Sequence, residues 1–109
     1  MKVQKLTQKE MEREIKESAN GKTVVIDFYA DWCGPCKMLA PIYEELSDEM
    51  SDVFFGKVNV EEERGAVSAY SVMSVPTVLV FKNGKKMAKS HGLVAKEQLR
   101  QTIHSVSLY

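Results

Sequence analysis

Two cysteines, Cys33 and Cys36, are the residues of this sequence best suited to chemistry, and the sequence contains no others. They enclose Gly34 and Pro35 within the hexapeptide WCGPCK, residues 32–37. A disulfide between residues so close in sequence closes a very small loop and adds little stability through chain entropy. A secreted domain held together by disulfides usually has more cysteines, spaced further apart. The pair therefore predicts redox chemistry, in which a dithiol and a disulfide interconvert.

The flanking residues place this pair between a strand and a helix. Thr23–Ala30, with the sequence TVVIDFYA, carries β-branched and aromatic residues on both alternating faces, which is typical of a central strand covered on both sides. A helix is predicted from about Gly34 to Met50, with Pro35 in its first turn, where the missing N–H is not needed. Cys33 then lies at the helix N-terminus, where free N–H groups and the macrodipole stabilise a thiolate and lower the pKa of the thiol.

A two-step exchange follows from this placement. Cys33 is predicted to attack a substrate disulfide as a thiolate and to form a mixed disulfide. Cys36 then attacks Cys33 and releases the reduced substrate. Positions i and i+3 of a helix have Cβ atoms about 5–6 Å apart, whereas a disulfide needs about 3.5–4.5 Å. A modest adjustment closes the bond, so both redox states fit nearly the same backbone.

Strand and helix patterns alternate along the rest of the chain. Thr7-Gln8-Lys9-Glu10 has the form of a capping box, and the helix that follows is predicted to end near Asn20-Gly21. The other predicted elements are a strand at 53–60, a helix at 62–70, strands at 77–81 and 85–90 around the turn Asn83-Gly84, and a helix at 96–106. The order β-α-β-α-β-α-β-β-α predicts an α/β fold with a mixed sheet, in one domain spanning residues 1–109.

Composition and charge argue against several classes of function. Lys plus Arg and Asp plus Glu both number 15, and a formal net charge of zero favours neither nucleic acid nor an acidic membrane surface as a partner. Residues 1–10 contain no apolar h-region, and no apolar run approaches the length of a membrane span. We therefore expect a cytoplasmic, monomeric protein without membrane association.

Two sets of polar residues are interpreted as having no functional role. His91 and His104 have neither the spacing of zinc ligands nor a plausible approach to the cysteines, so no metal site is expected. Four lysines at the hairpin are interpreted as a solvated surface rather than a binding patch: Lys82, Lys85, Lys86 and Lys89.

Taken together, the motifs resemble the thioredoxin family over nearly the whole chain. The matching segments are Asp27-Phe28, Trp32-Cys33-Gly34-Pro35-Cys36-Lys37, Pro41, Lys57-Val58-Asn59-Val60, Val75-Pro76-Thr77, Phe81-Lys82-Asn83-Gly84 and Gly92. The resemblance implies the thioredoxin fold, a five-stranded mixed sheet flanked by four helices. It also implies protein disulfides as substrates, a separate thioredoxin reductase as the electron source, and no bound cofactor besides the redox-active disulfide Cys33–Cys36.

Asp27 stands among apolar residues in the predicted central strand. Burial of a carboxylate is costly unless it is paired or protonated, so the pKa of Asp27 is expected to be raised. From the residues alone, a proton acceptor for Cys36 acting through water and a carboxyl at the margin of the sheet are equally good interpretations. The resemblance favours the proton acceptor and implies that Lys57 is its partner; the alternative for Lys57 is an exposed strand lysine.

Four further positions are candidates for the surface that meets the substrate. X-Pro bonds in proteins are mostly trans, but the resemblance implies a cis bond before Pro76 that faces the disulfide and leaves the backbone of Val75 free to pair with an extended substrate. Trp32 lies on the loop into the helix, which favours a partly exposed contact residue over a core residue. Gly92 and Val60 are assigned to substrate binding by resemblance; for Gly92 the alternative is a plain turn glycine.

The sequence departs from the usual family pattern at several positions, which leaves the choice of partners open: Tyr29, Ser71, Met73, His91 and Leu93. None of these departures changes the redox pair itself. Gly34 and Pro35 favour a reductant over the oxidase and isomerase relatives, which commonly carry histidine between the cysteines.

Three alternatives to a reductant remain. The first is a disulfide donor or isomerase of the same fold, which would differ from a reductant in reduction potential. The second is a binding subunit of a larger assembly in which the redox pair is incidental. A zinc-binding module ranks third, because two cysteines are only half of a structural zinc site.

Overall fold

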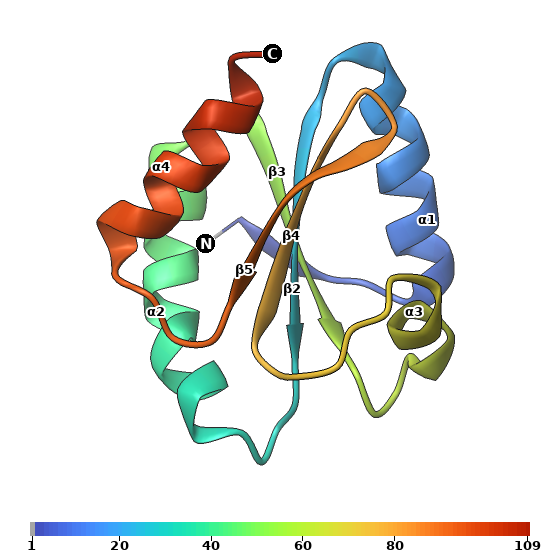
Figure 1. Ribbon diagram of the computed structural model, residues 1–109, viewed down its shortest axis with the longest axis vertical. Helices are drawn as coiled ribbons and strands as arrows, with labels where there is room; N and C mark the ends of the chain where they lie inside the picture. Colours follow the sequence, from blue (N-terminus) through green and yellow to red (C-terminus); the bar gives the residue numbers. More distant parts are fainter. Residues whose placement is uncertain (1) are drawn as a thin grey trace.

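The computed structural model describes residues 2–109, which alternate between strands and helices (Figure 1). The elements are β1 (Val3–Lys5), α1 (Gln8–Glu17), a short 3-10 helix η1 (Ser18–Asn20), β2 (Thr23–Tyr29), α2 (Gly34–Glu49), β3 (Val53–Asn59), α3 (Arg64–Ala69), β4 (Thr77–Lys82), β5 (Lys85–His91) and α4 (Lys96–Ser107). The predicted order β-α-β-α-β-α-β-β-α is confirmed. With η1 taken as the last turn of the first helix, the predicted ends of the elements differ from these bounds by at most two residues.

The five strands form one mixed sheet in the order β1-β3-β2-β4-β5. β1 and β2 both run parallel to β3, whereas β4 is antiparallel to β2 and to β5. Helices α1 and α3 cover one face of the sheet and α2 and α4 cover the other (Figure 1). The central strand β2 ends at Tyr29, and a short loop connects its carboxyl end to the N-terminus of α2 at Gly34.

Side chains of β2 alternate between the two helical layers because successive residues of a strand point to opposite faces. Val24, Ile26 and Phe28 pack in the layer of α1 and α3, whereas Val25 packs in the layer of α2 and α4. By the same alternation Asp27 lies on the side of α2. The buried strand thus presents one carboxylate toward the helix that begins with the cysteine motif.

The hydroxyl of Tyr43 holds α2 against the sheet. Its oxygen lies 2.7 Å from the carbonyl oxygen of Gly56 on β3 and 3.0 Å from that of Val25 on β2. The ring meets Phe55 edge-on, with 5.2 Å between the centroids. A buried hydroxyl needs such acceptors to offset its loss of hydration. Tyr43 therefore fixes the middle of α2 relative to the two strands beside which the site lies.

The first helix begins and ends as the sequence predicts. The Thr7 hydroxyl accepts a hydrogen bond from the Glu10 N–H at 3.2 Å, and the Glu10 carboxylate accepts one from the Thr7 N–H at 2.9 Å. This pairing lowers the pKa of Glu10 through the backbone hydrogen bond of Thr7. Gly21 ends η1 in the left-handed region with φ of 90°.

The interpretation of Lys82 as a solvated hairpin lysine is wrong. Lys82 is buried, and its Nζ donates hydrogen bonds to the backbone oxygen of Ser107, the last residue of α4, at 2.7 Å and to that of Tyr109 at 2.5 Å. The last carbonyls of a helix have no partner within the helix, and a lysine that reaches them is favourable. Lys82 therefore fixes the end of α4 against β4, a contact between residues far apart in sequence.

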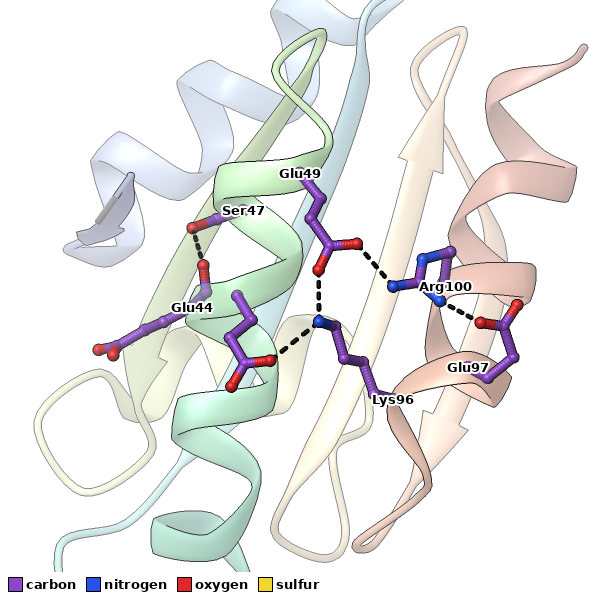
Figure 2. A network of polar contacts seen from close by, with 7 residues as sticks. Glu44, Ser47, Glu49, Lys96, Glu97 and Arg100 are labelled. Carbon is purple, nitrogen blue, oxygen red and sulfur yellow. Dashed lines mark hydrogen bonds and ion pairs between the residues drawn. The ribbon is translucent and has the colours of Figure 1, made fainter.

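A surface network of ion pairs connects α2 with α4 (Figure 2). Arg100 Nη2 lies 2.6 Å from Glu49 Oε1, and Lys96 pairs both with Glu49 and, at 2.9 Å, with Glu45. Arg100 also pairs with Glu97 of its own helix. The two cations lower the pKa of Glu49 through hydrogen bonds from Lys96 and Arg100. Exposed pairs of this kind contribute little individually, so the α2–α4 contact depends mainly on the apolar side chains beneath them.

The end of α3 is a Schellman motif. The Val72 N–H donates to the Val67 carbonyl at 3.0 Å and the Ser71 N–H to the Ser68 carbonyl at 3.4 Å, with Ser71 in the left-handed region at φ of 52°. Glycine is usual at the position of Ser71 because a side chain is strained at positive φ.

Ser71→Gly is therefore expected to raise the free energy of unfolding by about 0.5–1 kcal/mol, after the greater flexibility of glycine in the unfolded chain is deducted. Urea denaturation of the oxidised protein measures the change. Ser74→Gly, the same substitution three residues further along the loop, serves as the control and is expected to lower stability. A Ser71→Gly protein no more stable than the wild type would contradict the prediction.

Candidate active site: the Cys33–Cys36 pair

The two cysteines form a disulfide at the start of α2. Their Cα atoms are 5.2 Å apart, and both residues are buried. Cys33 is the N-cap of the helix, and its Sγ accepts a hydrogen bond from the Cys36 N–H at 3.2 Å. Pro35 stands in the first turn. In the reduced protein, an N–H at this position and the positive end of the helix dipole are both expected to stabilise a Cys33 thiolate.

One side of the disulfide opens into a groove of about 570 Å³. Its lining consists of Trp32, Cys33, Gly34, Pro35, Val60, Val67, Val72, Met73, Ser74 and Val75. None of these side chains is charged. Trp32 is 67% exposed, so it lies at the surface as expected of a contact residue and not in the core.

The loop before β4 brings the backbone of Val75 to the disulfide. The Val75–Pro76 peptide bond is cis, and the Val75 carbonyl oxygen lies 3.8 Å from Cys33 Sγ. Gly92, at φ of 73°, donates its N–H to the Pro76 carbonyl at 2.9 Å. Neither Gly92 nor Pro76 is part of the groove lining, whereas the predicted substrate-facing residues Trp32, Val60 and Val75 are.

The other side of the disulfide faces a narrower crevice of about 170 Å³. Its lining consists of Asp27, Tyr29, Ala30, Asp31, Cys36, Lys37, Ala40 and Lys57. Cys36 thus borders a polar space that contains Asp27, whereas Cys33 borders the apolar groove. This division gives the two sulfur atoms different surroundings.

Asp27 is 4% exposed, and its Oδ1 has no hydrogen-bond partner among residues 2–109. Burial raises the pKa of Asp27 to about 7, and the positive charge of Lys57 opposes this rise. A carboxyl with a pKa near the ambient pH can both accept and return a proton. The crevice is large enough for water to connect Asp27 with Cys36.

Lys57 is the residue of β3 directly beside Asp27 in the parallel pairing. It is partly buried, and its Nζ lies 5.3 Å from the centroid of the Tyr29 ring. A cation over an aromatic face is attracted by the ring. Lys57 therefore acts on Asp27 through its charge while its ammonium group rests on Tyr29.

Sequence reasoning missed several residues that shape the site. Val67 and Val72 line the groove, and Asn59 donates from Nδ2 to Asp31 Oδ2 at 3.4 Å, just before Trp32. Asn59 also accepts hydrogen bonds from the N–H groups of the two residues after Val60. For Asn59 the available signal was its position as a polar residue at the end of a buried strand. For the two valines no local pattern distinguishes a groove residue from a core residue.

Two observations concern other kinds of site. Within residues 2–109, no three side chains of His, Cys, Asp or Glu gather closely enough to hold a metal ion. None of the helices found in those residues has the length and apolar character needed to cross a membrane.

A sequence model of the thioredoxin family matches residues 2–105. The chain belongs to the thioredoxin family. It is 44% identical over 89 residues to the thioredoxin of Bacillus subtilis, covering 81% of this chain and 85% of that one. With the thioredoxin of Buchnera aphidicola it shares 41% identity over 101 residues, 92% of either chain.

Solved thioredoxin structures share the fold. The thioredoxin of Fasciola hepatica superposes with a TM-score of 0.85 at 38% identity, covering 96% of this chain and 98% of that one. Thioredoxin NaTrxh of Nicotiana alata gives a TM-score of 0.88 at 31% identity, covering 95% and 91%. The predicted thioredoxin fold is confirmed, and the chain is a dithiol–disulfide oxidoreductase with the protein-disulfide reductase function of thioredoxins.

The raised pKa of Asp27 has a consequence for stability. Because the folded-state pKa of about 7 exceeds the unfolded value of 3.8, the contribution of Asp27 is fully present below pH 3.8 and is lost as the pH rises through 7. The free energy of unfolding is expected to fall by about 2–3 kcal/mol between pH 5 and pH 8 from this group alone.

Asp27→Ala is expected to remove this fall and to be more stable than the wild type at pH 8. Guanidinium unfolding of the oxidised proteins at pH 5, 6.5 and 8 measures the difference. The exposed Asp52→Ala serves as the control and is expected to keep the wild-type dependence on pH. An Asp27→Ala protein with an unchanged pH slope would show that this carboxyl is not the group concerned.

Proposed function

We propose that Cys33 is the nucleophile and Cys36 the resolving residue of a protein-disulfide reductase, with Asp27 as the proton acceptor. The observation that carries this proposal is the contrast between the two sides of the disulfide. Cys33 borders the open apolar groove, where a substrate can reach it, while Cys36 borders the crevice that holds Asp27. An attacking sulfur needs access to substrate, whereas a resolving sulfur needs a base.

In the first step the reduced protein presents Cys33 as a thiolate, stabilised by the N-terminus of α2. Cys33 Sγ attacks one sulfur of the substrate disulfide, so that a mixed disulfide forms and the substrate S–S bond breaks. The second substrate sulfur leaves with the electron pair and takes a proton from water. Gly34 and Pro35 shape this end of the groove, because both line it beside Cys33.

In the second step Cys36 loses its proton to Asp27 through water in the crevice. The Cys36 thiolate attacks Cys33 Sγ, restores the disulfide seen in the structure, and releases the other substrate sulfur as a thiolate. Two electrons have then passed to the substrate. Lys57 tunes this step, because its charge opposes the rise in the pKa of Asp27.

The partners of this reaction follow from its balance. The oxidised protein needs two electrons to begin again, and we assign their supply to a separate thioredoxin reductase. The substrates are proteins with an accessible disulfide, bound at Trp32, Val60, Val75 and Gly92. We propose that residues 1–109 act as one thioredoxin domain and as a monomer; the cytoplasmic location stays a prediction.

Single cysteine substitutions test the assignment of the two sulfur atoms. Cys33→Ser is expected to abolish the reduction of insulin disulfides. Cys36→Ser is expected to form the mixed disulfide and stop there, so that it is recovered as a covalent adduct that dithiothreitol releases. Non-reducing electrophoresis and mass spectrometry detect the adduct. An adduct formed by Cys33→Ser instead would exchange the two roles, and equal activity of both variants with the wild type would contradict the mechanism.

The reduction potential separates a reductant from a disulfide donor or isomerase of the same fold. Thioredoxin in general has a reduction potential of about −270 mV, and this chain is expected to have a reduction potential near that value. Equilibration with dithiothreitol, followed by the fluorescence of Trp32, measures the potential. A value of about −120 to −180 mV would make the chain an oxidant or isomerase.

A further inference from the structure

We propose that Met73 makes this protein selective for disulfides flanked by a bulky apolar residue and disfavours those flanked by an acidic one. The proposal rests on the proposed function and names the substrate class of the same site. Met73 is 93% exposed, more than any other large apolar residue among residues 2–109, and it lines the groove that contains Cys33. Nothing in the reaction steps themselves requires an exposed methionine at this position.

The Schellman motif at the end of α3 fixes the position of Met73. The left-handed conformation of Ser71 turns the chain so that Val72, whose N–H is bonded to the Val67 carbonyl, is 8% exposed. Met73 follows directly and projects outward. A buried residue therefore anchors the backbone on one side of Met73, and this keeps Met73 among the residues that line the groove.

The loop is anchored on the other side of Met73 as well. The Thr77 hydroxyl donates to the Ser74 carbonyl at 2.7 Å, and Thr77 is itself buried at the start of β4. Between these two anchors the chain passes through Val75, whose carbonyl lies beside the Cys33 sulfur. The anchored segment that carries Met73 thus passes directly beside the reacting sulfur of Cys33.

Because Cys33 is one of the residues that line the groove, we assign the groove to the segment of a substrate that flanks the attacked disulfide. A substrate sulfur that reaches Cys33 must bring the residues next to it into the groove, and the backbone of Val75 offers an edge along which an extended segment can lie. A neighbouring side chain of that segment then meets Met73 and Trp32. Both of these exposed side chains contribute to the lining of the groove beside Cys33.

The lining determines which side chain is favoured there. Methionine is flexible and polarisable, so it adapts to aliphatic and aromatic partners of different shapes. A carboxylate placed in the groove loses hydration and finds no cation among the lining residues, which is unfavourable. The groove therefore selects by attraction of apolar residues and by rejection of acidic ones.

Three disulfide peptides that differ only in the residue next to the attacked cysteine test the proposal. The residue is Phe, Gly or Glu, and the reduced protein is oxidised by each peptide in a single turnover, with the thiol product measured by chromatography. The wild type is expected to react about tenfold faster with the Phe peptide than with the Glu peptide. Met73→Gln is expected to lower the ratio of the Phe to the Gly rate about fivefold. Met73→Arg is expected to favour the Glu peptide over the Phe peptide.

The matched control is Met38→Gln, the same substitution at a methionine that is 61% exposed but outside the groove lining. It is expected to keep the wild-type ratios. If Met73→Gln also keeps them, the proposal is overturned. If the wild type reduces all three peptides at equal rates, the proposed reductase function is supported and the proposed selectivity is overturned. If it does not reduce the Gly peptide, the proposed function itself fails.

A second measurement separates a substrate from a second copy of this chain as the occupant. Sedimentation of the wild type and of Met73→Gln over a range of concentrations is expected to show monomers of both. A wild-type dimer that Met73→Gln dissociates would show that the groove is a self-association surface, and it would overturn the assignment to substrate.

Discussion

Burial of β2 between two helical layers is the constraint on which the rest of the structure depends. The strand is covered on both faces, so its even-numbered apolar residues and Val25 can pack only if α1 and α3 lie on one side and α2 and α4 on the other. The same burial removes the side chain of Asp27 from water. Its side chain must face the layer of α2, where the apolar packing leaves Oδ1 without a partner among the described residues. Stability of the core and the raised pKa of this carboxyl thus have a single cause.

The position of the cysteine motif is determined by the end of β2. Only four residues separate the end of β2 from the first residue of α2, so Cys33 becomes the N-cap at the carboxyl edge of the sheet. Tyr43 holds the middle of the same helix to β2 and β3 through its hydroxyl. The two sulfur atoms are consequently fixed relative to Asp27, and the apolar and polar sides of the disulfide cannot exchange.

In the proposed mechanism, the contrast between those sides allows one small site to carry out two unlike steps. Attack on a substrate requires a sulfur that a large molecule can reach, while resolution requires a base protected from it. An uncharged groove beside Cys33 and a crevice with Asp27 beside Cys36 meet both requirements. The loop from Ser71 to Pro76 completes the groove from a part of the chain remote in sequence from the cysteines, and Val75 of this loop packs against the cluster that contains them.

Some features of this protein depend on residues that are neighbours in sequence, and others depend on contacts between distant segments. The spacing of Cys33 and Cys36, the capping box at Thr7, the turn at Asn83-Gly84 and the continuous apolar run of β2 each act within a few residues, so the sequence by itself determined the elements, their order and the redox pair. The apolar neighbours of Asp27 left burial and a place at the margin of the sheet as equal alternatives, and the structure shows that it is buried. Tertiary structure alone decided the features that depend on distant partners. Lys82 stands in a run of lysines that looks solvated, but it is buried because the unpaired carbonyls at the end of α4 arrive beside β4. Val67, Val72 and Met73 form part of the groove only because α3 packs against the sheet next to the cysteine loop. Local patterns record the preferences of neighbouring residues, whereas the surroundings of a side chain are set by segments that packing brings together from elsewhere in the chain.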